Sequence, residues 1–525
     1  MIYTFKRKLK RIVINLKIYT VKDYIDELKQ ENLLIETINC NNILNSLVQD
    51  MSYNSKEVKQ GCLFVCKGFG NNFKQEYLEE AIKRGAFCYV SNIEYNVNKP
   101  CILVKDGFLA LGILARKYFN NPQENLNVIG ITGTKGKSTT SYYVKYILDE
   151  YTKSKGKNDT AILSSIDMYD GVSKYESHIT TPESFDIHRH FSNAVKSNME
   201  NIVMEVSSQS LKLGRVNSVN YDIGVFLNIS EDHISDIEHL DFDDYLDSKL
   251  KLFKQSKIAC VNLNTDYLTK VLKASKDSPN VITFGTTKDA DIYGYDIQKD
   301  GFNTKFKVRT PYFEDEIMLT MSGLFNVENA LAAISVAVAL KVPYEYIYKG
   351  LSKARASGRM EVYADKEKRV IVIVDYAHNK LSFEKLYEST KKEYPQRKIV
   401  TVFGCPGGHA VNRRKDLGEL SGKYSDLSYL TTEDPREEDP IEICKEISMH
   451  IKKVNGKYKI IEDRGEAIKR AIFEANPNTV ILVTGKGNET RQKIGNKYVD
   501  CPTDVQYVKE YLKEYEEENK ETTKK

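Results

Sequence analysis

The stretch Asn127-Val-Ile-Gly-Ile-Thr-Gly-Thr-Lys-Gly-Lys-Ser-Thr-Thr140 joins an apolar strand to a turn rich in glycine and lysine. Apolar residues then recur at helical spacing from Val144 to Leu148, which predicts a helix after the turn. Backbone N–H groups of such a turn bind phosphate oxygens, while Lys137 can reach the outer phosphates and Ser138 can ligate Mg²⁺. The stretch therefore predicts an α/β domain that binds a nucleoside triphosphate.

The spacing of this turn departs from the strict phosphate-loop pattern. That pattern places a glycine five residues before Gly136, where this chain has Ile131, and the glycine here is Gly133. An ordinary strand-to-helix turn is the alternative interpretation. The strand and the helix on either side favour the phosphate site.

Length and charge bound the remaining possibilities. With 525 residues the chain is too long for one hydrophobic core and should divide into about three domains. Its 77 Lys and Arg residues against 73 Asp and Glu residues give a net charge of +4, which does not indicate a nucleic-acid or bulk membrane partner. Small anionic substrates are compatible with this balance.

Cysteine usage and hydropathy favour a cytoplasmic protein. The nine cysteines, scattered from Cys40 to Cys501, form no disulfide framework or Cys-x-x-Cys pair. No apolar stretch approaches the roughly 20 residues that a transmembrane segment needs. The basic residues at positions 5–17 lack the features of a signal peptide, so we expect a solvated extension, with binding to an anionic surface as the alternative.

The last third of the chain contains four apolar runs typical of buried strands, each followed by polar or glycine residues. Since ligands of open α/β sheets bind outside the carboxyl ends of the strands, we expect Asp375, Gly404, Glu433 and Gly485 to cluster along one edge. In the middle third, Glu205 follows the run Ile202–Met204 in the same way. Strands that alternate with helices in this manner predict parallel, doubly wound sheets.

Two groups in the middle third have the chemistry of Mg²⁺ ligands. Glu205 offers a carboxylate, and His233 lies in Asn228-Ile-Ser-Glu-Asp-His233 after a further apolar run. Mg²⁺ takes few protein groups and keeps several waters, so a carboxylate beside bound phosphates is suitable. Histidine is a less usual Mg²⁺ ligand, and a structural, hydrogen-bonded His233 is the alternative.

Nine ordered motifs make a resemblance specific, and together they cover about residues 50–510. They are Gly133-Thr-Lys-Gly-Lys-Ser138, Thr180-Thr-Pro182, Met204-Glu-Val-Ser-Ser208, Asn228-x-x-x-Asp-His233, Tyr245-x-x-x-Lys249, Gly323-x-Phe-Asn-x-x-Asn329, Gly358-Arg359, Asp375-Tyr-Ala-His378 and Gly485-Lys-Gly487. This set resembles the Mur ligase family, and within it the branch of UDP-N-acetylmuramoyl-tripeptide synthetases.

The resemblance implies three α/β domains. A UDP-binding domain would span residues 1–121, with a basic extension at 1–19. A central ATP-binding domain with a phosphate loop and a parallel sheet would span 122–356. A Rossmann-like domain that binds the amino acid would span 357–525.

The implied activity is an ATP-dependent ligation in peptidoglycan biosynthesis. ATP would phosphorylate the terminal carboxylate of UDP-N-acetylmuramoyl-L-alanyl-D-glutamate, and the amine of a diamino acid would attack the acyl phosphate. The implied cofactors are ATP, Mg²⁺ at two sites and a CO₂-derived carbamate on Lys249, and we expect a monomer.

The resemblance also assigns residues to the ATP and metal sites. For ATP they are Gly133, Thr134, Lys135, Gly136, Lys137, Ser138, Thr139, Asn326, Asn329, Arg359 and Asp375. The metal ligands would be Ser138, Glu205, His233 and the carbamate of Lys249, and the catalytic residues Lys137, Glu205, His233 and Lys249. By composition alone Lys249 would be a solvated lysine on a helix face, and Asn326 and Asn329 would be helix caps.

For the UDP-muropeptide, the matching residues are Ser55, Thr180, Thr181, Ser207, Gln209 and Arg215. Two of them carry departures from the family pattern. The uridine signature around Ser55, usually Asp-Ser-Arg, reads Asn54-Ser-Lys56, so the contacts to UDP are open. Gln209 replaces a histidine and can still donate a hydrogen bond.

The incoming amino acid would meet Arg414, Glu433, Asp434, Arg436, Gly485 and Glu489. Diaminopimelate-adding enzymes carry Asp-Asn-Pro-Arg where this chain reads Glu433-Asp-Pro-Arg436. A guanidinium can bind the distal carboxylate of diaminopimelate with two hydrogen bonds, whereas it repels the distal ammonium of lysine. Arg436, Arg414 and Glu489 favour meso-2,6-diaminopimelate.

Three substitutions count against this choice: Asp434 for asparagine, Asn488 for histidine, and Asn379-Lys380 for Thr-Pro. Lysine or another amine therefore stays open. A folylpolyglutamate synthetase-like ligase and a paralogue that binds nucleotide and muropeptide without ligating them are further alternatives. The stretch Ser52–Gly61 argues against the first, and retention of Lys137, Glu205 and Lys249 argues against the second.

Overall fold

The computed structural model describes residues 17–68, 73–177, 179–230, 238–321, 323, 325–408 and 410–523, with side chains up to 519. By their contacts these residues form two compact units. One lies within residues 1–134, 148–261 and 265–282, and the other within 135–147, 262–264 and 283–525. His233 and the basic stretch 5–16 lie outside the described residues.

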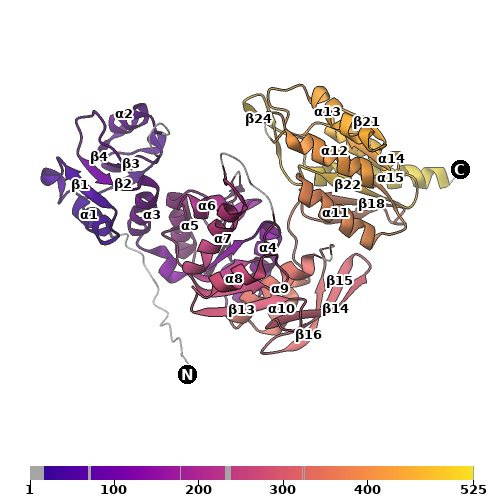
Figure 1. Cartoon of the computed structure of the whole chain (residues 1–525), viewed down its shortest axis with the longest axis horizontal. Coiled ribbons are helices and arrows are strands. Elements are labelled where there is room, and N and C mark those ends of the chain that lie inside the picture. The colour runs from indigo at the N-terminus through magenta and orange to yellow at the C-terminus, as the bar shows by residue number, and fades with distance from the viewer. Residues whose placement is uncertain are drawn as a thin grey trace. The chain divides into compact units, whose positions relative to one another are not determined.

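The first unit begins with a small α/β sheet (Figure 1). Its elements are α1 (Val21–Gln30), β1 (Leu34–Ile38), β2 (Asp50–Ser52), β3 (Cys62–Val65), α2 (Gln75–Arg84), β4 (Ala86–Ser91), β5 (Cys101–Val104) and α3 (Gly107–Tyr118). The strand order is β1-β5-β4-β3-β2, and only β1 runs antiparallel to its neighbour. Helices α1 and α3 pack on one face and α2 on the other, because the strands are apolar on both faces.

The middle third of the chain continues with strands and helices in alternation. Its elements are β6 (Asn127–Thr132), α4 (Lys137–Ser154), β7 (Ala161–Leu163), β8 (Asp167–Tyr169), β9 (Lys174–Glu176), α5 (Ser184–Lys196), β10 (Asn201–Glu205), α6 (Ser208–Lys212), β11 (Tyr221–Phe226), α7 (Phe242–Lys254), β12 (Ser256–Asn262), α8 (Leu268–Ser275), β13 (Asn280–Gly285), β14 (Ile292–Asp300), β15 (Asn303–Arg309), β16 (Glu314–Leu319), α9 (Asn326–Ala339) and α10 (Tyr344–Leu351).

Within the first unit, the strand order β12-β11-β6-β10-β7-β8-β9 places the strand before the phosphate turn at the centre. Strands β12, β11, β6, β10 and β7 are parallel, as the sequence predicts. The hairpins β7-β8-β9 and, in the second unit, β14-β15-β16 are antiparallel. Strands β8, β9 and β14 to β16 were missed because their mixed polar and apolar sequences differ from the continuous apolar runs of the buried strands.

The last third forms a three-layer sandwich in the second unit (Figure 1). Its elements are β17 (Glu361–Ala364), β18 (Val370–Asp375), α11 (Lys380–Glu393), β19 (Lys398–Phe403), α12 (Asn412–Tyr424), β20 (Leu427–Leu430), α13 (Pro440–Lys453), β21 (Tyr458–Ile460), α14 (Arg464–Phe473), β22 (Thr479–Thr484), β23 (Arg491–Ile494), β24 (Lys497–Asp500) and α15 (Asp504–Thr523).

Alternate residues of the sandwich strands face opposite layers. The strand order is β17-β18-β22-β19-β20-β21, parallel except for β17. Ile371 and Ile373 pack with α11, α12 and α13, whereas Val370, Val372 and Val374 pack with α14 and α15. The predicted α/β class with parallel sheets is confirmed. Among the described residues, no helix is both long and apolar enough to span a bilayer.

Candidate functional site

The phosphate turn is shaped by two glycines between β6 and α4. Gly133 has φ of 158° and Gly136 has φ of 87°, and α4 begins at Lys137. A Cβ atom on Gly136 would lie 2.2 Å from Oδ1 of Asn329. Glycine is therefore required here both for the positive φ and for the close approach of α9.

Asn326 and Asn329 hold this turn from the start of α9. Both are buried, and Nδ2 of Asn329 donates to Oδ1 of Asn326 at 2.9 Å. The hydroxyl of Thr140 donates to Oδ1 of Asn329 at 3.4 Å. Neither asparagine caps α9, whose N-cap residue is Phe325. Helix capping therefore does not explain the pair, which lies beside the predicted ATP site.

The remaining residues predicted for the phosphates lie on the turn or in the first turn of α4. Ser138 and Thr139 are buried, while Lys135 and Lys137 are half-buried. The hydroxyl of Thr134 lies 3.0 Å from that of Tyr245 and accepts a hydrogen bond from the Ser230 N–H. These contacts hold the turn against the segment after β11 and against helix α7.

Lys249 lies inside the protein. Its side chain on α7 is 2% exposed, and Nζ donates to the carbonyl oxygen of Gly133 at 3.0 Å. The ammonium also lies 4.7 Å from the centroid of the Tyr245 ring. The alternative of a solvated lysine is therefore wrong.

Glu205 is the last residue of β10, and its side chain is buried. Oε1 accepts hydrogen bonds from the backbone N–H of Ser165 at 2.9 Å and from its hydroxyl at 3.3 Å. Sequence reasoning missed Ser165, which follows β7 and had no motif of its own. The carboxylate of Glu205 and the hydroxyl of Ser138 are donor types that suit Mg²⁺.

Within the described ranges, no three His, Cys, Asp or Glu side chains gather in a way that could hold a metal ion. This finding is compatible with Mg²⁺, which binds through one or two carboxylates together with substrate phosphates.

Four of the residues predicted for the muropeptide contact one another around Thr181. Its hydroxyl donates to the carbonyl of Glu205 and accepts from the Ser207 N–H, each at 3.0 Å. Arg215 donates to the carbonyl of Thr181 at 3.1 Å and to Oε1 of Gln209 at 2.9 Å. The substituted Gln209 thus orients the arginine.

The two other predicted muropeptide residues are placed differently. Thr180 is half-buried next to Thr181. Ser55 begins a short 3-10 helix between β2 and β3, where its buried hydroxyl donates to Oε2 of Glu80 at 2.7 Å.

The strand ends of the last third form the predicted edge. Asp375 pairs with Thr484 in the register of β18 and β22. A Cβ on Gly485, whose φ is 104°, would lie 2.9 Å from Oε2 of Glu433. A Cβ on Gly404 would lie 3.0 Å from the Glu433 backbone nitrogen and Cβ. The clustering expected from the sequence is what the structure shows.

Two acidic residues on this edge have pKa values raised by burial, an effect opposed by a nearby arginine. Burial raises the pKa of Asp375, while the nearby Arg359 and hydrogen bonds from the Met360 and Ala377 N–H groups favour its charged form. Arg359 also lies over the ring of Tyr376, 4.2 Å from its centroid. Burial raises the pKa of Glu433 to about 7, against the opposing effect of Arg464.

A buried lysine forms ion pairs with two of the residues that were predicted to bind the incoming amino acid. Nζ of Lys486 lies 2.8 Å from Oδ1 of Asp434 and 2.7 Å from Oε2 of Glu489. Tyr376 donates to the other oxygen of Glu489 at 2.7 Å. Lys486 and Tyr376 were not predicted as site residues, although both stand within quoted motifs. The extra carboxylate of Asp434 is therefore paired with Lys486, which it shares with Glu489.

Arg414 and Arg436 differ in their surroundings. Arg414 on α12 forms ion pairs with Glu446 at 2.6 Å and Glu438 at 2.9 Å, so it fastens the loop after β20. Arg436 on that loop has φ of 54°, and its N–H donates to the Lys493 carbonyl at 3.0 Å. Within the part of the chain that the structure describes, its buried Nε has no hydrogen-bond partner.

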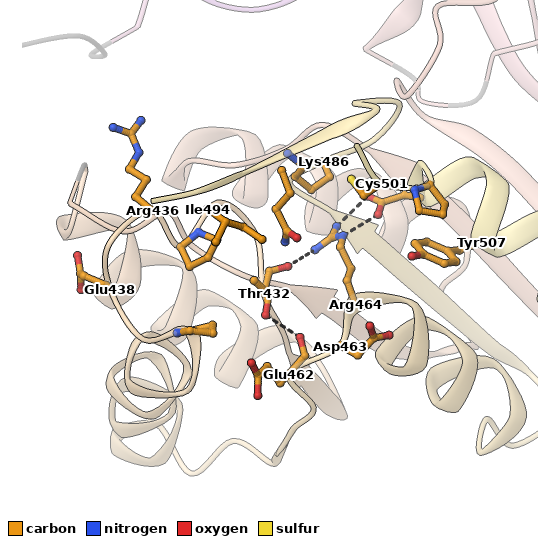
Figure 2. A pocket seen from close by; sticks show the side chains of 15 residues that line it. Thr432, Arg436, Glu438, Glu462, Asp463, Arg464, Lys486, Ile494, Cys501 and Tyr507 are labelled. Carbon is orange, nitrogen blue, oxygen red and sulfur yellow. Dashed lines mark hydrogen bonds and ion pairs between the residues drawn. The ribbon is translucent and has the colours of Figure 1, made fainter. Parts of the chain in front are cut away.

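Arg436 lines a cavity of about 560 Å³ between the loop after β20 and the segment around β23 (Figure 2). Lys486, Arg464, Asp504 and Cys501 also line it. The wall carries both cations and carboxylates, which suits a zwitterionic ligand.

Two family models match this chain. The Mur ligase middle domain matches residues 131–337, and the glutamate ligase domain of Mur ligases matches residues 358–487. The first match begins within β6, next to the phosphate turn, and the second begins at Gly358.

The relatives in this family share most of their length with the chain. The UDP-N-acetylmuramoyl-L-alanyl-D-glutamate–L-lysine ligase of Enterococcus faecalis is 38% identical over 457 residues, covering 85% of this chain and 88% of the relative. The corresponding 2,6-diaminopimelate ligase of Caldanaerobacter subterraneus is 38% identical over 456 residues, covering 86% and 92%.

A solved structure of a UDP-N-acetylmuramoyl-L-alanyl-D-glutamate–2,6-diaminopimelate ligase has the same fold. Its TM-score is 0.65 at 22% identity, with 95% of this chain and 99% of that chain covered. Fold, motifs and relatives agree, and the chain belongs to the Mur ligase family, in the branch of UDP-N-acetylmuramoyl-tripeptide synthetases.

Proposed function

We propose that this chain is an ATP-dependent ligase that joins a diamino acid to UDP-N-acetylmuramoyl-L-alanyl-D-glutamate in peptidoglycan biosynthesis. The observation that carries the proposal is the agreement between two relatives named for this reaction and a glycine turn packed against buried Asn329. The proposal includes a cytoplasmic monomer with domains at 1–121, 122–356 and 357–525.

The chemistry runs in two steps. A carboxylate oxygen of the D-glutamyl residue attacks the γ-phosphorus of ATP, and ADP leaves. The amine of the diamino acid then attacks the acyl carbon, loses a proton and expels inorganic phosphate. Phosphoryl transfer needs positioning and charge neutralisation, which the N–H groups of the turn and Lys137 supply.

The chain's own residues would hold Mg²⁺ through Ser138 and Glu205, together with His233 and the carbamate of Lys249. Mg²⁺ would neutralise phosphate charge during the transfer. The contact from Lys249 to the Gly133 carbonyl supports the carbamate, because a carbamate nitrogen keeps one N–H that can make the same hydrogen bond. Thr181, Ser207, Gln209 and Arg215 would bind the muropeptide.

The preferred amino acid in this proposal is meso-2,6-diaminopimelate. The buried Nε of Arg436 favours a carboxylate ligand, and the added carboxylate of Asp434 is paired with Lys486. Lysine is the second candidate, because one of the relatives at 38% identity adds lysine.

The test is phosphate release by the purified protein with ATP, Mg²⁺, UDP-N-acetylmuramoyl-L-alanyl-D-glutamate and either diaminopimelate or lysine. We expect phosphate release that requires both the UDP-muropeptide and an amino acid, and that is faster with diaminopimelate than with lysine. Faster release with lysine would reverse the choice of amino acid. Nucleotide binding without release for any amine would favour the non-catalytic paralogue and overturn the proposal.

Gly136→Ala should weaken nucleotide binding about 10- to 100-fold, because the new Cβ would overlap Oδ1 of Asn329. Titration with a fluorescent ATP analogue measures the effect. Gly156→Ala is the matched control, since Gly156 also has positive φ, 65°, but open space at its Cβ. Equal affinities for the wild type and Gly136→Ala would contradict the packing argument.

Lys249→Ala should lower phosphate release about 10- to 100-fold, because a ligand of the metal would be lost. Added bicarbonate should not restore the rate, whereas acetate or formate should restore part of it by replacing the carboxylate of the carbamate. Lys251→Ala, an exposed lysine on the same helix, is the control. Full activity of Lys249→Ala would refute the carbamate role.

Arg436→Ala should raise the KM for diaminopimelate about 10- to 100-fold and leave the KM for ATP unchanged, because a charged hydrogen bond to the distal carboxylate is lost. Initial rates at varied diaminopimelate measure it. Arg491→Ala removes a nearby exposed arginine that pairs with Asp500 and should have little effect. An unchanged KM for diaminopimelate would remove Arg436 from the selectivity argument.

A further inference from the structure

Two charged side chains that no motif singled out meet in the wall of the cavity. Arg464 is the first residue of α14, and Asp504 is the first residue of α15. Nε and Nη2 of Arg464 donate to the two carboxylate oxygens of Asp504 at 2.6 Å and 2.8 Å. The exposed fractions of their side chains are 9% and 1%, so this bidentate pair is almost completely removed from water.

The same pair binds the backbone of two loops. Nη2 of Arg464 donates to the Thr484 carbonyl at 2.7 Å, at the end of β22, and Nη1 donates to the Thr432 carbonyl at 3.5 Å, after β20. Asp504 accepts from the Gly487 N–H at 2.8 Å. In Figure 2, Arg464 lies between Thr432 and Cys501, with dashed lines toward both sides.

Those two loops carry the groups assigned to the amino acid. Asp434 and Arg436 lie two and four positions after Thr432, while Lys486 precedes Gly487 and Glu489 lies two positions after it. The ion pair of Lys486 with Asp434 joins the two loops at one point. The Arg464–Asp504 pair joins them at a second point, through Thr432, Thr484 and Gly487. A planar guanidinium fixes two carbonyls and a carboxylate in one geometry, which a flexible ammonium does not.

We propose that Arg464 and Asp504 are positioning residues for the incoming amino acid. They hold the loops after β20 and β22 in the register that places Arg436 and Glu489 on one binding surface. This inference rests on the proposed function for its kinetic consequence, but the loop order that it describes belongs to the free protein.

Arg464→Lys should raise the KM for diaminopimelate at least about tenfold, with kcat and the KM for ATP within about twofold of the wild type. Asp504→Asn should act in the same direction, and Asp504→Glu should recover part of the loss. Arg470→Lys is the control, because Arg470 on the same helix forms an ion pair with Glu474 at 2.6 Å and is 47% exposed.

Amide hydrogen exchange of the ligand-free protein supplies the second measurement. In Arg464→Lys and Asp504→Asn, residues 484–491 should exchange faster, while the strands β18 and β19 keep their protection. If the KM values of all substrates rise together with a loss of protection across the sheet, the pair is only structural and the proposal is overturned. Unchanged exchange at 484–491 also overturns it.

The two proposals fail in different ways. If the wild type releases no phosphate with any amine, the ligase assignment fails, while faster exchange at 484–491 still supports the role of the pair. If the wild type is active and both variants keep its KM for diaminopimelate, the positioning role fails alone. Should Arg464→Lys not fold, Asp504→Asn carries the test, because asparagine keeps an oxygen acceptor for the guanidinium.

Discussion

The parallel pairing of β6 with β10 and β11 is the constraint on which the candidate phosphate and muropeptide sites depend. Parallel strands end at the same edge of a sheet, so the turn after β6 and Glu205 at the end of β10 emerge together. Backbone N–H groups of such a turn, together with the N-terminus of the helix that follows, are suited to bind phosphate oxygens. The turn can therefore bind phosphates only because the strands on both sides of β6 run in the same direction.

In the last third of the chain, parallel strands again end at one edge, and the loops that follow them also carry buried charged side chains. Strands β18, β22, β19 and β20 end in a row, and their loops bring Asp375, Glu433 and Lys486 close together. Buried charges are costly unless they are paired, and the charges here are paired by Lys486 with Asp434 and by Arg464 with Asp504. The ion pairs fix loops that have little regular structure of their own.

Much of the fold was predictable because the buried strands are continuous apolar runs. Val370–Val374 and Val480–Val483 face helices on both sides, so their sequences contain no alternation that could obscure them. The antiparallel β14-β15-β16 hairpins were not predicted. In β15, Thr304, Phe306 and Val308 are buried and the residues between them are not, and this half-buried pattern gave no continuous signal.

The sequence by itself determined the phosphate turn, the order of the motifs and the family, because each motif is a short run of residues that can be read without the fold. Only the tertiary structure decided that Lys249 is buried against Gly133, that Lys486 pairs with Asp434, and that Arg464 joins two loops together with Asp504. These contacts join residues 40 to 116 positions apart. Charge compensation over such separations depends on how the sheets bring the loops together, and no local pattern encodes it.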